Sequence, residues 1–266
     1  MKCAIIGLGW LGVPLAKYLS EFGHEISGTT RSTEKQLQLQ AYGWNVKCWD
    51  AVTNEPLDTE FFQGCDVVVV NLPPGKLREN NLYVSVCETL ARTIPTSAKV
   101  IFISTTGIYP DTIITADENK WSRSLNLTDN LFALTEEQLH ILLNDRLTIV
   151  RFAGLIDPNR NPARFLAGKQ NVPNPDAPVN LIHLNDCIQV IYKIIEKQIW
   201  GEVFNACSSE HPTRQVYYTT MCQRFGLEPP TFIDVNKVKK LVSNTKSMQQ
   251  LGIEYSHSIW MEEGKH

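Results

Sequence analysis

Short runs of apolar residues recur along the chain, and most stretches between them carry apolar residues at helical spacing. Regular alternation of strand-like and helix-like segments is typical of a parallel sheet with helices on both faces. The pattern therefore predicts an α/β fold built on a doubly wound parallel sheet. The strand-like runs lie at residues 3–6, 24–29, 45–49, 66–72, 99–104, 147–152 and 202–206.

Two later regions interrupt this alternation. Residues 153–181 contain five prolines and little periodicity, which predicts an ordered excursion over the strand ends. After Val203, the pattern indicates a helix that ends at Gly226, followed by a loop and a strand. We therefore expect a core and a small mixed substrate-side lobe. The core comprises residues 1–155, with 178–206 returning to it, and the lobe comprises residues 156–177 and 207–266.

A glycine-rich turn, Gly7-x-Gly9-x-x-Gly12, stands directly behind the first apolar run, and a helical pattern follows it. Between a strand and a helix, this motif lets backbone N–H groups approach the pyrophosphate of a dinucleotide, as in the Rossmann fold. A strand-turn-helix that binds nothing is the alternative. The residues expected to hold the pyrophosphate are Gly7, Gly9, Trp10, Leu11 and Gly12.

The end of the second run bears on the choice of cofactor. Sites selective for NAD usually carry Asp or Glu there for the ribose 2′-hydroxyl, whereas Arg suits the 2′-phosphate of NADP. This chain has Thr30, Arg31 and Ser32, and the next acid is Glu34. We therefore expect NADP(H) rather than NAD(H). The alternative is that Arg31 is a solvated residue at the start of a surface helix.

Two further strand ends are candidates for the adenine site. Asp50 ends the third run, and Leu72, Pro73 and Pro74 follow the fourth. In an open α/β sheet these positions border the adenine and its ribose. Asp50 could accept a hydrogen bond from the adenine amino group, and Leu72, Pro73 and Pro74 could pack against the adenine ring. Alternatively, Asp50 caps a helix and the prolines only turn the chain.

Composition excludes several classes of protein. A net charge of −3 and an isoelectric point of about 6.1 give no basic surface for nucleic acid or anionic lipid. No apolar run approaches the ~20 residues of a membrane span, and the N-terminus enters a predicted core strand rather than a signal peptide. Seven cysteines without zinc spacing predict no metal site, buried structural thiols and a cytoplasmic protein.

Three later segments resemble the extended short-chain dehydrogenase/reductases. "VIFISTTGIYP" (100–110) is similar to the family's fifth strand, "VRFAGLIDP" (150–158) to its sixth, and "NLIHLNDC" (180–187) to its Asn-x-Ile-His-Val-x-Asp segment. The resemblance implies a Rossmann fold, and it places Thr105 at the catalytic Ser/Thr with Tyr109 as the nearby phenol. The whole-chain pattern is similar to an atypical, YeeZ-type branch labelled NAD-dependent epimerase/dehydratase-like.

The chain departs from that family in its proton-transfer residues. A Tyr-x-x-x-Lys pair normally exchanges a proton with the substrate oxygen. Aligning Glu137 with the family's helical glutamate puts Ala133 at the lysine and Asp129 at the tyrosine. No tyrosine occurs in residues 110–191 and no lysine in residues 121–168, so no alignment restores the pair. The glycine loop is also shifted by one residue, as in atypical members.

Four residues are candidates for substrate binding. Arg160, Arg164 and Lys169 could clamp a phosphate or carboxylate, and a solvated loop surface is the alternative for each. His183 stands at a turn that borders the substrate pocket in the family, and it could titrate near neutral pH. Alternatively, His183 satisfies backbone groups in that turn, and Asp186 is a helix cap or an anchor.

Three functions fit these observations. The favoured one is an NADP-dependent oxidoreductase or epimerase/dehydratase-like enzyme for a polar, anionic or sugar-nucleotide small molecule, with Tyr109 or an ordered water as proton donor. The second is a catalytically inactive NADP(H) sensor or regulatory protein. The third is a β-hydroxyacid dehydrogenase-like enzyme, which shares the glycine motif but requires a long all-helical C-terminal domain. The resemblance is also compatible with a homodimer.

Overall fold

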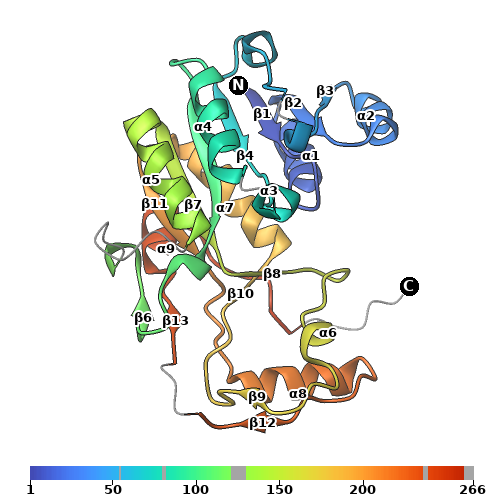
Figure 1. Ribbon diagram of the computed structural model, residues 1–266, viewed down its shortest axis with the longest axis vertical. Coiled ribbons are helices and arrows are strands. Elements are labelled where there is room, and N and C mark those ends of the chain that lie inside the picture. The colour runs from blue at the N-terminus through green and yellow to red at the C-terminus, as the bar shows by residue number, and fades with distance from the viewer. Residues whose placement is uncertain (54, 80–81, 121–129, 236–238, 261–266) are drawn as a thin grey trace. The chain divides into compact units, whose positions relative to one another are not determined.

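The computed structural model describes residues 1–53, 55–79, 82–120, 130–235 and 239–260. Seven strands form one sheet in the order β11-β7-β5-β4-β1-β2-β3 (Figure 1). The strands are β1 (Lys2–Ile6), β2 (Glu25–Thr30), β3 (Asn45–Cys48), β4 (Val67–Val70), β5 (Lys99–Thr105), β7 (Leu147–Phe152) and β11 (Val203–Ala206). Each of the seven predicted runs thus forms a strand of this sheet, and the α/β fold is confirmed.

The order of the strands determines where a site can form. β1 pairs in parallel with β2 on one side and with β4 on the other, and the pairs β2–β3 and β4–β5 are also parallel. The chain builds outward from β1 to β3 and then returns to β4 on the opposite side of β1. In open α/β sheets, ligands bind outside the carboxyl ends of the strands where the order reverses, which here is between β1 and β4.

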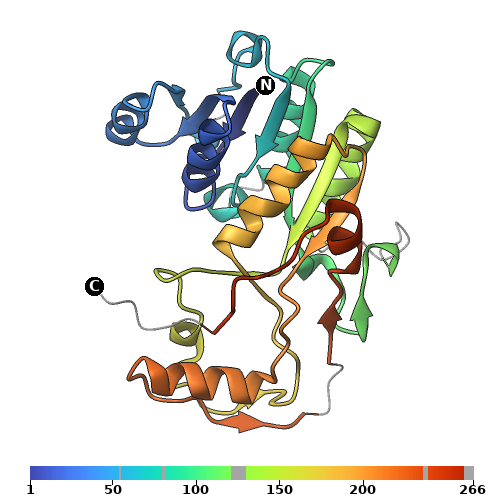
Figure 2. The same cartoon turned by 180° about the vertical axis from the view of Figure 1, so that it is seen from behind.

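Helices cover both faces of the sheet. α4 (Tyr83–Thr93) and α5 (Leu131–Leu143) lie side by side on one face (Figure 1). α1 (Gly12–Glu21) and the C-terminal half of α7 (Leu184–Lys197) lie on the other (Figure 2), where the Tyr18 and Tyr192 rings meet edge to face. The other helices of the described segments are α2 (Thr33–Gln40), α3 (Gly75–Glu79), α6 (Ala163–Leu166), α8 (Arg214–Arg224) and α9 (Thr245–Leu251).

The chain groups into two compact units, each with its own core. The first comprises Met1–Ser104, Ser122–Val150 and Ile191–Val203, and the second comprises Thr105–Trp121, Arg151–Val190 and Phe204–His266. In the first unit, apolar side chains of β4 and β5 pack under α4 and α5. The second unit contains a smaller core around α8. It also holds parallel pairs of short strands: β8 (Gly154–Ile156) with β10 (Leu181–His183), β9 (Val172–Pro173) with β12 (Phe232–Ile233), and β6 (Thr115–Ala116) with β13 (Leu241–Val242).

One cysteine differs from the sequence expectation. Six thiols are buried, but Cys48 is exposed, so the prediction that every cysteine is buried is wrong at this position. The reason is that β3 is the edge strand of the sheet, and Cys48 is its last residue. Within the described part of the chain, no helix combines the length and the apolar character that a bilayer span requires.

Candidate functional site

A cavity of about 550 Å³ opens at the carboxyl ends of β1 to β4 in the first unit. Its size is within the range of small-molecule sites. Three of the predicted cofactor residues, Trp10, Leu11 and Gly12, are absent from its lining and form the turn into α1 instead. The predicted residues that do line the cavity are Gly7, Gly9, Thr30, Arg31, Ser32, Asp50, Leu72, Pro73 and Pro74.

Two glycines of the loop, Gly7 and Gly12, stand where the surrounding backbone leaves no room for a side chain. Gly7 has a φ of +107°, its N–H donates to Thr29 Oγ1 at 3.0 Å, and its carbonyl accepts from Asn71 Nδ2 at 3.1 Å. A Cβ on Gly7 would strike the Asn71 carbonyl oxygen, and one on Gly12 would strike the Gly7 carbonyl oxygen. Only glycine therefore permits this turn, which brings the backbone to the cavity wall.

The turn leads into a helix N-terminus suited to an anion. Leu11 is the N-cap of α1 and offers no side-chain hydrogen bond, and the first turn contains no acidic residue. The first N–H groups of a helix and its dipole attract negative charge. Next to Gly7 and Gly9 in the cavity wall, this arrangement fits the pyrophosphate of a dinucleotide.

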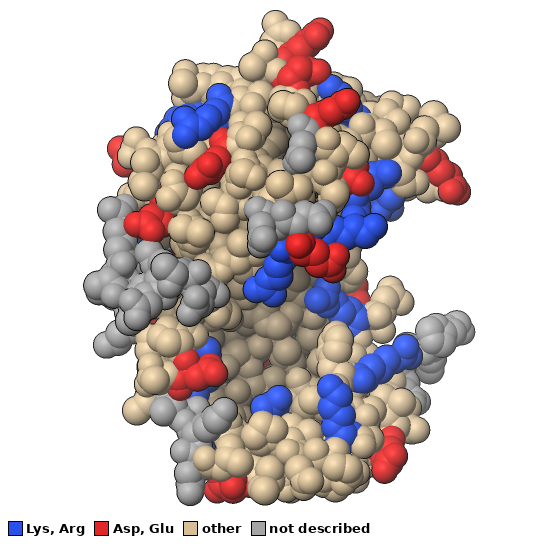
Figure 3. All heavy atoms as spheres, viewed as in Figure 1, with Lys and Arg blue, Asp and Glu red and all other residues tan. Residues whose placement is uncertain are grey.

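Three cations line the same cavity: Arg31, Lys35 and Lys76. On the face shown in Figure 3, Lys and Arg side chains gather below α2 and beside α3. Arg31 is exposed just after β2, and Ser32 caps α2 by accepting a hydrogen bond from the Lys35 N–H at 3.2 Å. Ser32 retains its hydroxyl hydrogen for donation to a ligand, so the turn can offer both charge and hydrogen bonds to a phosphate.

Asp50 combines the two roles considered for it. Its Oδ1 accepts a hydrogen bond from the Val52 N–H at 3.0 Å at the start of a short 3₁₀ turn, and the residue also lines the cavity. The sequence did not indicate the remaining lining residues, among which Trp49, Asn71, Lys35, Lys76 and Glu79 carry polar or charged side chains. Trp49 and Asn71 directly follow β3 and β4, and this position at strand ends could have identified them from the sequence. For Lys35, the spacing of one helical turn from Arg31 could have done the same.

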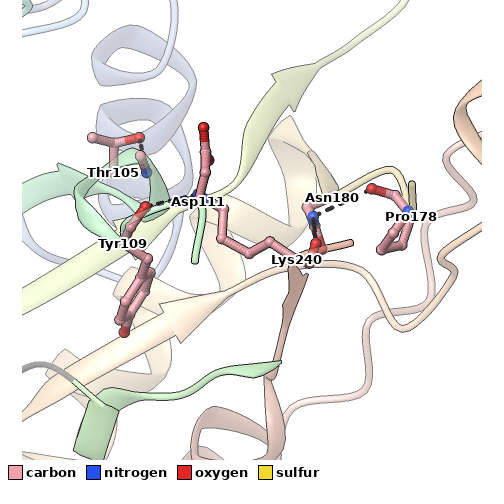
Figure 4. A network of polar contacts seen from close by, with 7 residues as sticks. Thr105, Tyr109, Asp111, Pro178, Asn180 and Lys240 are labelled. Carbon is pink, nitrogen blue, oxygen red and sulfur yellow. Dashed lines mark hydrogen bonds and ion pairs between the residues drawn. The ribbon is translucent and has the colours of Figure 1, made fainter. Parts of the chain in front are cut away.

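The proposed catalytic residues Thr105 and Tyr109 belong to the second unit. Thr105 Oγ1 accepts a hydrogen bond from the Gly107 N–H at 3.1 Å (Figure 4). Lys240 Nζ, from the chain near β13, donates to the Tyr109 carbonyl oxygen at 2.7 Å and pairs with Asp111 at 3.1 Å. Lys240, which the sequence did not indicate, therefore holds the loop that carries Tyr109 in place through these two contacts.

The Tyr109 phenol points into the interior of this unit. The side chain is buried; its hydroxyl donates to Asn205 Oδ1 at 2.9 Å and accepts from Arg151 Nη1 at 2.9 Å. Burial raises the pKa of Tyr109, and the adjacent Arg151 opposes that rise. The phenol is therefore neutral at physiological pH and bridges two buried polar side chains.

We expect Tyr109→Phe to lower the free energy of unfolding by about 1–3 kcal/mol, because it removes the shared partner of two buried polar groups. Urea denaturation followed by circular dichroism measures this loss. Tyr42→Phe, at a tyrosine 55% exposed, serves as the matched control and is expected to have little effect. Equal stability of the two variants would contradict the bridging role.

His183 lies in a compact cluster of titratable groups at the end of β10. Its ring stacks on that of His257, with centroids 5.0 Å apart. His257 Nδ1 lies 2.6 Å from Oδ1 of Asp186, whose other oxygen is buried without a hydrogen-bond partner among the described residues. His183 Nδ1 accepts the Asn185 N–H at 3.2 Å, so the backbone contact considered for this histidine is present. Asp186 anchors the C-terminal segment through His257.

The surroundings of His183 predict a pH dependence of stability. Burial lowers the pKa of His183, His257 lowers it further, and Asp186 and Asp157 oppose this. The pKa of His183 in the folded protein therefore lies below its value near 6.5 in the unfolded chain. The contribution of the neutral His183 ring to the free energy of unfolding is complete above pH ~6.5, and it is lost as the pH falls through the folded pKa. We expect His183→Asn to show a smaller loss of melting temperature than the wild type between pH 7.5 and 5.0. If plots of melting temperature against pH were parallel for the variant and the wild type, this prediction would be contradicted.

The predicted substrate cations are exposed in the second unit. Arg160 lies opposite Asp157 in a bridge just beyond β8, whose last residue pairs with His183 in β10. Arg164 on α6 and Lys169 after it are both exposed. The structure thus brings Arg160 and His183 to the same strand ends. On α5, Ala133 is fully buried, whereas Asp129 lies outside the described residues.

The chain is similar to known proteins over most of its length. Residues 2–126 match the NAD binding domain of 6-phosphogluconate dehydrogenase, a segment that includes every residue of the cavity wall. Two epimerases are among the solved structures that share the fold. UDP-glucuronic acid 4-epimerase from Bacillus cereus, in complex with NAD, is 18% identical, with a TM-score of 0.76 over 97% of this chain and 94% of that one. UDP-glucose 4-epimerase from Thermotoga maritima is 17% identical, with a TM-score of 0.75 over 99% and 96%.

One sequence relative is closer to this chain than these structures. Protein YeeZ of Escherichia coli (strain K12) is 31% identical over 268 residues, which covers 96% of both chains. The domain match indicates an NAD-binding domain in residues 2–126, and the two structures share the Rossmann fold of this chain. Since the identity extends over both units, the chain belongs to the YeeZ family of Rossmann-fold proteins.

Proposed function

We propose that this protein binds NADP(H) in the first-unit cavity and acts as an oxidoreductase or epimerase/dehydratase-like enzyme on a polar small molecule. The observation that carries the proposal is the cavity itself, which is lined by Gly7 and Gly9 of the loop that leads into α1 and by three cations. A nicotinamide cofactor bound there would supply hydride transfer.

The residues of the cavity fit that cofactor in distinct roles. Gly7 and Gly9 with the start of α1 would hold the pyrophosphate, and Arg31, with Ser32 and Lys35, the 2′-phosphate. The acid that would hold a free 2′-hydroxyl has no counterpart directly after β2, where Arg31 and Ser32 follow Thr30. Asp50 and Leu72 would border the adenine.

For the substrate, we propose a polar, anionic or sugar-nucleotide molecule. Arg160, Arg164 and Lys169 offer exposed positive charge in the second unit, and His183 stands beside the loop of Arg160. Thr105 could donate its hydroxyl hydrogen to a substrate oxygen. The two epimerases of the same fold act on UDP-sugars, as their names state, which supports testing this class first.

A titration with NADPH and NADH, followed by tryptophan fluorescence and calorimetry, tests the binding proposal. We expect NADPH to bind at least tenfold more tightly, because only NADPH carries the group that the cations can pair with. Equal affinities would remove the role of Arg31, and no binding of either would overturn the function.

A cofactor-binding sensor without catalytic activity is the second candidate. It is favoured by the buried Ala133 at the position that the resemblance assigns to the lysine. An assay of NADPH oxidation in the presence of carbonyl compounds and sugar nucleotides distinguishes the enzyme from the inactive sensor. Any activity found is then measured again in Thr105→Ala and Tyr109→Phe. The β-hydroxyacid dehydrogenase alternative fits less well, because the described part of the second unit mixes short strands and helices.

A further inference from the structure

A large aromatic side chain stands in the cavity wall beside the arginine that the proposed function assigns to the 2′-phosphate. Trp49 directly follows β3 and Arg31 directly follows β2, and both residues line the cavity. None of the contacts proposed for the cofactor uses Trp49. Because aromatic faces bind other flat rings, its position at the cavity wall calls for an explanation.

The register of the sheet puts Arg31 and Trp49 side by side. Thr30, the last residue of β2, is paired in parallel with Cys48, the last residue of β3. The Trp49 N–H continues this pairing by donating to the Thr30 carbonyl oxygen at 2.8 Å. Since neighbouring strands lie about 4.8 Å apart, Arg31 and Trp49 leave the sheet next to each other.

The Trp49 indole is held in place by the protein itself. Its Nε1 donates to the Glu55 carbonyl oxygen at 2.7 Å, which fixes the ring to the loop after β3. Part of the side chain packs against the core of the first unit, and Trp49 is half-buried in total. The ring is therefore ordered before a ligand binds, which lowers the entropic cost of binding.

The indole also borders a second cavity. This cavity has a volume of about 140 Å³ and is lined by the loop after β3 and by α4. It shares Trp49 and Ala51 with the larger cavity. Since protein interiors are close-packed, a large ring that borders two cavities is unusual for a residue that only fills the core. Trp49 is better explained as part of a binding surface.

The arrangement of the two side chains matches a nucleoside with a 2′-phosphate. In adenosine 2′-phosphate, the base and the phosphate are attached to neighbouring carbon atoms of the ribose, C1′ and C2′. A phosphate held by Arg31 at the end of β2 therefore brings the base to a neighbouring position at the sheet edge. Trp49 occupies that position at the end of β3.

We propose that Trp49 is the platform on which the adenine ring of NADP(H) stacks, and that Arg31 and Trp49 together select a 2′-phosphoadenosine group. This inference rests on the proposed function, which does not itself require Trp49. The contact involves only the adenosine half of the cofactor. The ligand class is thus a nucleotide that carries a purine base and a 2′-phosphate.

Adenosine 2′,5′-bisphosphate tests this contact, because it carries the base and the 2′-phosphate but no nicotinamide. We expect Trp49→Ala to weaken the bisphosphate and NADPH to the same extent, by roughly five- to 150-fold, as is typical when a base loses an aromatic stacking partner. Trp49→Phe keeps an aromatic ring and is expected to stay within about threefold of the wild type. Calorimetric titration gives these dissociation constants.

Fluorescence supplies a readout that a purely structural role of Trp49 would not change. Adenine absorbs at shorter wavelengths than those at which indole emits, so the bisphosphate quenches tryptophan by contact and not by energy transfer. We expect it to quench the emission of the wild type and to lose most of this effect in Trp49→Phe. Trp44→Phe is the matched control, because Trp44 is 6% exposed and is absent from the cavity lining.

The outcomes separate this inference from the function on which it rests. If the wild type binds neither NADPH nor the bisphosphate, the proposed function and the inference both fail. If the wild type binds NADPH but not the bisphosphate, only the inference is overturned. The same holds if it binds both ligands and Trp49→Ala changes neither dissociation constant, or changes that of NADPH alone.

A second variant covers the case in which Trp49→Ala does not fold. Trp49→Leu keeps an apolar side chain in the wall but removes the flat ring, so we expect it to fold and to lose affinity as Trp49→Ala does. The melting temperature without ligand checks the fold of each variant. Wild-type affinity for the bisphosphate in a folded Trp49→Leu would also overturn the inference.

Discussion

Replacing Gly12 with alanine is expected to lower both the stability of the protein and its affinity for NADPH. The new Cβ would collide with the Gly7 carbonyl oxygen and come within 3.3 Å of Ile5 Cγ2, so backbone must move. Forcing extra atoms into a packed site costs about 1–3 kcal/mol. Both effects can be measured on the same sample. We expect a lower denaturation midpoint and a larger dissociation constant for NADPH than in the wild type.

Gly9→Ala is the matched comparison for that variant. A Cβ at Gly9 meets no atom within 4 Å, yet Gly9 lines the cavity. We expect unchanged thermal stability and a roughly tenfold or greater loss of NADPH affinity, because the added methyl keeps the phosphates from the backbone. Full affinity in Gly9→Ala would show that the loop does not contact the cofactor.

The second large effect concerns Arg31. We expect Arg31→Gln to weaken NADPH roughly tenfold to a hundredfold while NADH changes less than threefold, because charge-assisted hydrogen bonds of about 1.5–3 kcal/mol are lost only with the 2′-phosphate. Calorimetric titration of both cofactors gives the two constants. Arg92→Gln on α4 removes an exposed arginine that is not part of the cavity lining and serves as the control.

Arg31→Lys refines this test. Lysine keeps the charge but not the planar fork that binds phosphate with two hydrogen bonds, so we expect intermediate affinity. A parallel loss of NADPH and NADH in Arg31→Gln would indicate that the arginine supports the loop instead. The cofactor preference would then have to be sought in Lys35 or Lys76, which line the same cavity.

Local pattern predicted the strands and the glycine loop because each depends on neighbouring residues. The apolar run before Gly7 and the helical spacing after Gly12 are sufficient to place a strand, a turn and a helix. For the same reason, most of the predicted cofactor residues line one cavity: parallel strands end at the same edge of the sheet, so residues at strand ends converge.

What the sequence by itself determined is therefore the α/β fold, the position of the glycine loop between β1 and α1, and the missing Tyr-x-x-x-Lys pair. Only the tertiary structure showed that Tyr109 points inward to Asn205 and Arg151, and that Glu136 meets Ser104. These contacts join residues 96, 42 and 32 positions apart. Periodicity records which face of a helix or strand is buried, but the partner across that face depends on how the elements pack.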